Sequence, residues 1–194
     1  MISFRKPSAD SLRRIIATQS GLGFTYPSVG ATKTGDPTPA GYVVDHTRVE
    51  LGRGSTVFDR AQKALARWDQ FRLGWLQAFP DDTPLRAGET VIVLARAFGV
   101  WWTNAARIVY TIDEPEESLA RFGFAYGTLP GHVESGEERF LIEWDRETDQ
   151  VWFDILAFSR PRHIMTRIGR RQARAMQKKF GQQSTAAMRA VLSA

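Results

Sequence analysis

The sequence contains no cysteine, which excludes disulfide bonds, thiolate metal ligands and cysteine nucleophiles. It also lacks the H-E-x-x-H motif of zinc proteases, the Walker sequence of P-loop proteins and the G-x-S-x-G motif of a serine nucleophile. Common catalytic templates are therefore absent, and we expect no cofactor. The lack of thiols also fits a reducing compartment.

Long apolar segments are missing as well. The most apolar run, residues 90–102, is interrupted by Arg96 and is too short to span a bilayer. The first ten residues lack the apolar region of a signal peptide. We therefore expect a soluble, cytoplasmic protein.

The length and composition favour one folded unit. With 43% apolar residues, 194 residues suffice for one substantial core but not for two ordinary domains and a linker. We expect a single domain over residues 1–194. Within it, residues 1–41 should form a short helix near residues 8–19 and a loop that packs on the domain, because residues 21–41 hold five glycines and three prolines.

Hydrophobic periodicity predicts one helix, a series of strands and a last helix. The helix at about residues 57–71 places Phe58, Ala61, Leu65 and Trp68 on one buried face, and Thr56 and Asp59 have the spacing of a capping box. The expected strands are residues 41–51, 89–98, 104–112, 121–129, 137–145 and 150–159. Short links between the later strands indicate antiparallel neighbours.

The last predicted helix, residues 162–192, is amphipathic. Its expected buried face consists of Ile164, Ile168, Ala175, Met176, Phe180, Ala187 and Val191. A sheet with one apolar face must be covered, and this helix is the only long element left to do so. The predicted fold is therefore α+β, with a curved antiparallel sheet of six or more strands gripping the C-terminal helix. Because the helix face is rich in small residues, either a ligand cavity or close packing at Ala175 is expected.

One carboxylate in the predicted strands lies on the apolar side. Glu138 alternates with Phe140, Ile142 and Trp144, whereas Glu137 and Arg139 take the opposite face. A carboxylate in a core needs a partner or a raised pKa, and functional pockets often contain such groups. The candidate partners are Arg96, Tyr110 and Tyr126.

Two further groups are candidates for a site. His132 and Glu134 point the same way in an extended chain and, with Glu138 or His46, could hold a metal. A loop whose polar residues satisfy backbone groups is the favoured explanation, and no metal is expected. Trp101 and Trp102 lie at a turn between strands and either pack in the core or form the mouth of an apolar pocket.

Residues 160–179 carry eight arginines and lysines and no acid. Such a segment is either a solvated helix face or a contact for an anionic membrane or nucleic acid. Without aromatic residues for base stacking, we expect weak, salt-sensitive contact through Arg162 to Lys179 and no specific nucleic acid partner.

Five stretches carry a family resemblance: FTYPSVGAT (24–32), DHTRVELG (45–52), NAARIVY (104–110), RFGFAYGTLPGH (121–132) and WFDILAFSRP (152–161). They resemble the bacterial and plant family called domain of unknown function 1990, and the similarity covers nearly the whole chain. That family is grouped with the helix-grip proteins, which include the birch pollen allergen and steroidogenic lipid-transfer domains. The resemblance implies a hydrophobic ligand cavity and supplies no established catalytic residues.

Three functional hypotheses follow. The first is the binding of a small apolar or amphipathic molecule between the sheet and the last helix, near Glu138, Arg96 and Tyr126. The second is an enzyme in the same cavity that uses Glu138 or His132 as general acid or base. The third is an adaptor that meets anionic membrane or nucleic acid through the basic helix.

Overall fold

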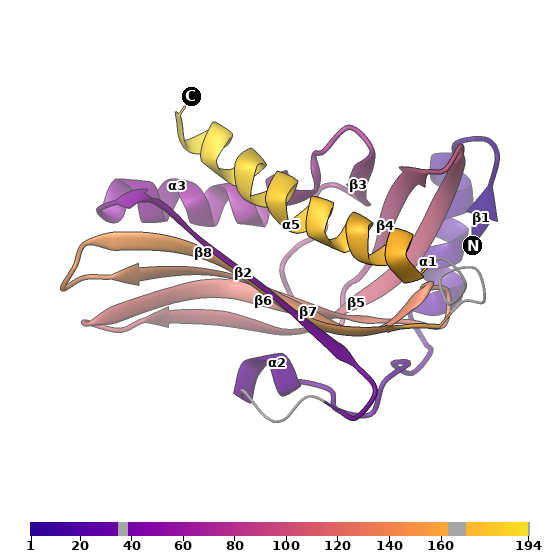
Figure 1. Cartoon of the computed structure of the whole chain (residues 1–194), viewed down its shortest axis with the longest axis horizontal. Helices are drawn as coiled ribbons and strands as arrows, with labels where there is room; N and C mark the ends of the chain where they lie inside the picture. The colour runs from indigo at the N-terminus through magenta and orange to yellow at the C-terminus, as the bar shows by residue number, and fades with distance from the viewer. Residues whose placement is uncertain (35–38, 163–169, 194) are drawn as a thin grey trace.

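The computed structural model describes residues 1–34, 39–162 and 170–193 (Figure 1). Its strands are β1 (Ile2–Ser3), β2 (Val43–Arg53), β3 (Leu76–Phe79), β4 (Thr90–Ala97), β5 (Val100–Pro115), β6 (Leu119–Thr128), β7 (Glu134–Asp145) and β8 (Gln150–Pro161). They form one antiparallel sheet in the order β2-β8-β7-β6-β5-β4-β3, with β1 paired to β5. Consecutive hairpins thus build most of the sheet, and β2 is added beside β8.

The helices cover both faces of this sheet. They are α1 (Ala9–Gln19), α2 (Ala31–Thr34), α3 (Ser55–Ala66), the 3-10 turn η1 (Asp69–Phe71) and α5 (Arg170–Ser193). Figure 1 shows α5 crossing the strands on the same side of the sheet as α3, with α2 on the opposite side. The predicted α+β fold, a curved antiparallel sheet gripping a long C-terminal helix, is confirmed.

All six predicted strands are present within a few residues of their expected ends. The two strands that were not predicted, β1 and β3, are two and four residues long. Strands this short carry no measurable alternation, because at least four or five residues are needed to establish a period of two. Their place in the sheet comes from pairing with β5 and β4 instead.

The N-terminal segment packs on the outer face of the sheet, opposite α5. Leu12 of α1 lies in a buried cluster with Ile92, Leu94 and Leu129. Further along, Tyr26 packs edge-on against the ring of Phe158, at a centroid distance of 5.5 Å. Both faces of strands β4 and β8 are therefore buried, which explains their near-continuous apolar sequences.

The inner face is filled by α3 and the residues after it. The predicted buried residues Phe58, Ala61, Leu65 and Trp68 are all buried. The predicted end of the helix at residue 71 is wrong, because α3 ends at Ala66 and Trp68 follows it in a left-handed conformation with a φ of 59°. The predicted capping box is wrong, because α3 begins at residue 55 and its N-cap, residue 54, is a glycine without a side-chain hydrogen bond. The buried face of α3 survives this error since it depends on spacing along the helix and not on where the helix begins.

The orientation of α5 differs from the prediction. Met176 and Phe180 line the space between α5 and the sheet, and Val191 packs against the core, as expected, but Ala175 is exposed. The buried stripe continues through Ser184 and Met188, both fully buried. The predicted face was chosen from apolar residues alone and therefore omitted the buried Ser184. As a result, it was placed too far around the helix, toward Ala175.

Two residues of the predicted helix face, Ile164 and Ile168, lie outside the described residues. Within the described part of the chain, no helix is long and apolar enough to cross a membrane.

Candidate functional site

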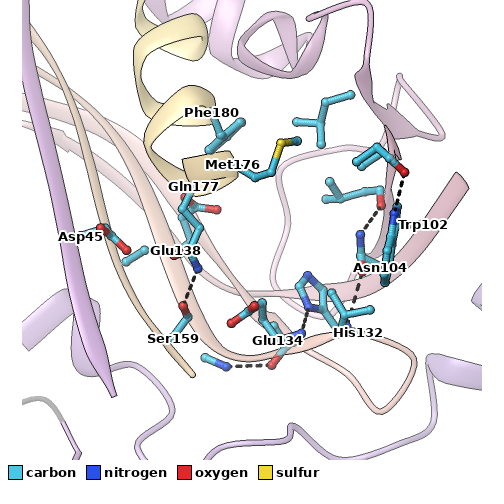
Figure 2. Close-up of a pocket in the computed structure, with 18 of the residues that line it drawn as sticks. Asp45, Trp102, Asn104, His132, Glu134, Glu138, Ser159, Met176, Gln177 and Phe180 are labelled. Carbon is cyan, nitrogen blue, oxygen red and sulfur yellow. Dashed lines mark hydrogen bonds between the residues drawn. The ribbon is translucent and has the colours of Figure 1, made fainter. Parts of the chain in front are cut away.

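A cavity of about 670 Å³ lies between the inner face of the sheet and the first half of α5. Most of its wall is apolar, and seven aromatic side chains contribute to it: Phe4, Phe71, Trp75, Phe98, Trp102, Tyr126 and Phe180. Figure 2 shows Met176, Gln177 and Phe180 of α5 on one side of this space and the polar residues of the strands around it. The small side chains of Ala95 and Ala157 in its lining leave the space open.

Two exposed phenylalanines belong to the lining of the cavity. Phe4 is 88% exposed and Phe98 is 68% exposed. Phe98 occupies the turn between β4 and β5 with a φ of 54°, a conformation that bulky residues rarely adopt. Since both rings reach bulk water, they mark where the cavity opens to solvent.

Strand β7 supplies the acidic part of the wall. Glu134, Gly136 and Glu138 alternate along the strand and all line the cavity. At Gly136 a Cβ atom would lie 1.9 Å from the carbonyl oxygen of Phe158, so only glycine permits this close approach of β7 and β8. The wall between the two carboxyl groups therefore carries no side chain.

Glu138 is enclosed by protein yet keeps part of its surface accessible, because it faces the cavity. Tyr126, directly opposite on β6, donates a hydrogen bond of 2.5 Å from its hydroxyl to Glu138 Oε2. Burial raises the pKa of Glu138 to about 7, although the hydrogen bond from Tyr126 opposes this shift. The carboxyl group can thus gain or lose a proton near neutral pH.

Glu134 is a second carboxyl group of the same kind. Burial raises its pKa to about 7, while a hydrogen bond with Ser159 and the charge of Arg174 act in the opposite direction. Its Oε2 atom is buried and has no hydrogen-bond partner in the described structure. Sequence analysis treated Glu134 as a metal ligand or as part of a polar loop, because the predicted strand began at residue 137. Strand β7 begins at Glu134, so the alternation extends back from Glu138 to it.

His132 lies at the same end of the cavity, but as a neutral ring. Burial, together with the nearby charges of the N-terminal amine and Arg162, lowers its pKa to about 3. Its Nδ1 accepts a hydrogen bond of 2.9 Å from the backbone N–H of Glu134. The remaining proton is therefore on Nε2, and the ring is a weak base at neutral pH.

Three of the residues expected at the site do not line the cavity. Arg96 is exposed on the outer face, where its guanidinium lies 5.9 Å from the centre of the Trp101 ring. Trp101 and Trp102 point to opposite faces because they are consecutive in a strand, and only Trp102 lines the cavity. A bulge between Ile108 and Tyr110 turns Tyr110 outward.

The structure thus brings Trp102, Tyr126, His132 and Glu138 to one cavity. Of the three expected partners of Glu138, it supplies Tyr126.

The outer face carries a polar network that sequence analysis did not anticipate. Glu137 is only 2% exposed and accepts hydrogen bonds from the Tyr26 hydroxyl, the Gly30 and Thr32 backbone N–H groups and the Thr32 hydroxyl. Residues 26–32, which are distant in sequence, thus cover this face of β7. No local pattern in β7 distinguishes such a covered glutamate from a solvated one.

His46 belongs to this outer face and not to the cavity. Its Nε2 lies 2.6 Å from Asp154 Oδ2, and Arg139 donates to Asp154 Oδ1 at 2.9 Å. His46 and His132 therefore lie on opposite faces of the sheet. Among residues 1–34, 39–162 and 170–193, no group of three His, Cys, Asp or Glu side chains is arranged to hold a metal.

Comparison with known proteins places this cavity in a family context. The model described as "Domain of unknown function (DUF1990)" matches residues 25–187. The chain belongs to the DUF1990 family. The family resemblance found in the sequence is thereby confirmed, and the matched region includes β7, β8 and the cavity-facing half of α5.

Relatives of this DUF1990 chain occur in distant organisms. A UPF0548 protein of Dictyostelium discoideum is 35% identical over 195 residues, covering 93% of this chain and 90% of its own. One from Deinococcus radiodurans is 37% identical over 172 residues, covering 82% of this chain and 83% of its own. Both share most of their length with this chain.

The structure of a Helicobacter pylori protein shows a shared fold. The hypothetical protein jhp0584 from Helicobacter pylori aligns with a TM-score of 0.50 at 13% identity, covering 87% of this chain and 95% of that one. The crystal structure of Ara h 8.0201 aligns with a TM-score of 0.46 at 10% identity, covering 79% and 100%. At such low identity, the Helicobacter likeness concerns the fold alone.

The two cavity acids make the stability of the DUF1990 chain pH-dependent. Their ordinary pKa is 4.5 and their folded pKa is about 7, so between these values the folded state binds more protons than the unfolded state. Stability contributed by the protonated acids is therefore lost as pH rises from about 4.5 through 7. Urea unfolding measures the free energy of unfolding as the pH is raised from about 5 to 8. We expect this free energy to fall less in the double variant Glu134→Gln/Glu138→Gln than in wild type. Equal losses in the two proteins would contradict the raised pKa values.

Proposed function

We propose that this protein binds a small apolar or amphipathic molecule in the cavity between the sheet and α5. The observation that carries the proposal is the cavity itself, about 670 Å³ with a mostly apolar wall and a few converging polar groups. Ligand pockets typically measure about 300–1,000 Å³ and combine these two features. The rings of Trp102 and Phe180 provide contact area, and Tyr126, His132 and Glu138 provide polar contacts.

The test is native mass spectrometry of protein purified from its own host. We expect a second species heavier than the bare chain by the mass of one small molecule, which denaturing conditions release. As an independent measurement, an apolar fluorescent dye should bind and then be displaced by the extracted molecule. A single species with the mass of the bare chain, together with no dye binding, would remove the basis for the proposal.

A second candidate function, catalysis in the same cavity, is favoured by one observation. The Tyr126–Glu138 pair places a carboxyl group with a pKa of about 7 inside an enclosed space, where a general acid or base operates well. His132 is the weaker candidate, since its pKa of about 3 makes the ring a poor base. No substrate is implied by either group.

The Glu138→Gln variant separates the two functions. Glutamine keeps the shape and hydrogen bonding of the side chain but cannot exchange the proton. We expect the variant to change ligand occupancy in native mass spectra. Host extract incubated with the variant should have the same metabolite profile as extract incubated with wild type. An extract component that wild type consumes and the variant does not would instead support catalysis.

Contact of α5 with an anionic surface is a subsidiary proposal. The described basic residues of its first half include Arg171, Arg174, Lys178 and Lys179, all exposed. Two of them already have partners within the chain, since Arg174 pairs with Asp45 and Lys179 lies 4.9 Å from the centre of the Trp75 ring. Any such contact is therefore weak and decreases with added salt.

A further inference from the structure

The cavity has a charge opposite to that of the whole protein. Three carboxyl side chains face it, from Asp45, Glu134 and Glu138, and no lysine or arginine occurs among the described residues that line it. The chain as a whole carries a net charge of +5. The acids of the cavity are thus a local feature that the overall composition does not produce.

Cations close to the cavity are already engaged by other groups. Arg174 of α5 forms a two-pronged pair with the carboxylate of Asp45. The N-terminal amine of Met1 donates to the carbonyl oxygen of Thr103 at 2.9 Å, and Arg162 donates to the carbonyl oxygen of Pro130 at 2.5 Å. Glu134 and Glu138 form no ion pair in the described structure.

These two acids also have hydrogen-bonding capacity left over. Glu134 Oε2 has no hydrogen-bond partner in the described structure, and Glu138 receives one hydrogen bond, from Tyr126. A buried carboxylate without a cation is costly, and a positively charged group placed beside it removes much of that cost. Aromatic faces such as those of Trp102 and Phe180 attract cations as well.

We infer that the ligand combines an apolar ring system with a basic nitrogen, whose ammonium group is held by Glu134 and Glu138. This inference rests on the proposed binding function and specifies its ligand class. The ring occupies the aromatic part of the cavity, and the nitrogen lies toward β7. Fatty acids, phosphate esters and other anions are disfavoured, because no described cation of the lining meets them and the acids repel them.

The test compares three probes that share one ring system: 1-naphthylmethylamine, 1-naphthalenemethanol and 1-naphthoate. Isothermal titration calorimetry at pH 7.5 measures the affinity of each for the purified full chain. We expect the amine to bind at least about tenfold more tightly than the alcohol, because a charge-assisted hydrogen bond to a largely buried carboxylate is worth about one power of ten or more. The carboxylate should bind more weakly than both, because the acids repel it.

Two variants assign the effect to these acids. In the double variant Glu134→Gln/Glu138→Gln, the affinities for the amine and the alcohol should differ by less than about threefold, since the carboxylates that attract the ammonium group are gone. The matched control, Glu147→Gln, changes an exposed glutamate in the turn between β7 and β8 and should retain the full preference. Circular dichroism checks that both variants are folded.

The pH dependence adds a second measurement. The groups around the acids are Tyr126 on β6, Asp45 on β2, Arg174 on α5 and the neutral His132. Raising the pH from about 5.5 to 8 ionises the two acids while the amine stays protonated, so amine binding should tighten and alcohol binding should not.

The outcomes distinguish the two levels of the proposal. If none of the three probes binds and the native protein carries no ligand, the binding function itself fails. If the alcohol or the carboxylate binds as tightly as the amine, the cavity binds ligands but the inference about a basic nitrogen is overturned. An amine preference that persists unchanged in the double variant overturns it too, since another group would then hold the charge.

Discussion

Replacing Glu137 with glutamine is expected to lower the free energy of unfolding by about 3 kcal/mol, a large part of the stability of an ordinary domain. Glu137 accepts hydrogen bonds from four donors of Tyr26, Gly30 and Thr32 and is almost fully buried. Glutamine brings an NH₂ group that faces these donors without accepting from them, so buried N–H and O–H groups lose their partner. Urea unfolding measures the change.

Hydrogen exchange provides a local measurement for the same variant. The amides of Gly30 and Thr32 donate directly to Glu137 and should exchange faster in Glu137→Gln than in wild type. Glu147→Gln, at an exposed position, serves as the control and should change stability by less than about 0.5 kcal/mol. A Glu137→Gln protein as stable as this control would mean that residues 26–32 are not held by the carboxylate.

Enlarging Ala157 to tryptophan is expected to abolish ligand binding while largely preserving stability. Ala157 lines the cavity and lies beside Glu138 in the pairing of β7 with β8. The indole therefore enters open volume, and we expect unfolding free energy to change by less than about 1 kcal/mol, whereas overpacking a filled core costs about 1–3 kcal/mol. Native mass spectrometry and dye titration should show loss of the bound molecule and at least about a tenfold loss of affinity.

Ala175→Trp is the matched control for this variant. Sequence analysis placed Ala175 on the buried face of the last helix, but the structure exposes it. The same substitution there should affect neither ligand content nor stability. If Ala157→Trp binds ligand normally, the ligand lies elsewhere, and if it loses 3 kcal/mol or more, this part of the cavity is not open.

The inner wall of the site was largely predictable from alternation. Glu138 was expected on the apolar side of its strand, and it faces the cavity. The expectation succeeded because the period of two is fixed by the pleat of the strand wherever the strand is regular. It failed for Tyr110, because the bulge after Ile108 shifts the alternation by one residue, and the sequence there carries no glycine or proline to announce it.

Sequence analysis also expected Arg96 to be a partner of Glu138, but the sequence could not show which face of the sheet Arg96 occupies. Arg96 shares a strand face with Ile92 and Leu94, and that face looked like the inner one because it is apolar. Both faces of β4 are in fact covered, one by α1 and the other by the main core. Where both faces are apolar, alternation groups residues correctly but cannot identify which group faces which layer.

The sequence by itself determined the six longer strands, the longer helices, the antiparallel pairing of strands joined by short links and the presence of a carboxyl group on the apolar side of β7, because these depend on local periodicity and on short links. Tertiary structure decided what covers each face. Tyr26 reaches Glu137 across 111 residues of sequence, and the rotation of α5 is set by the packing of Ser184 and Met188. Contacts of this range arise from three-dimensional packing, so a pattern within one element tells which side chains lie together but not what lies opposite them.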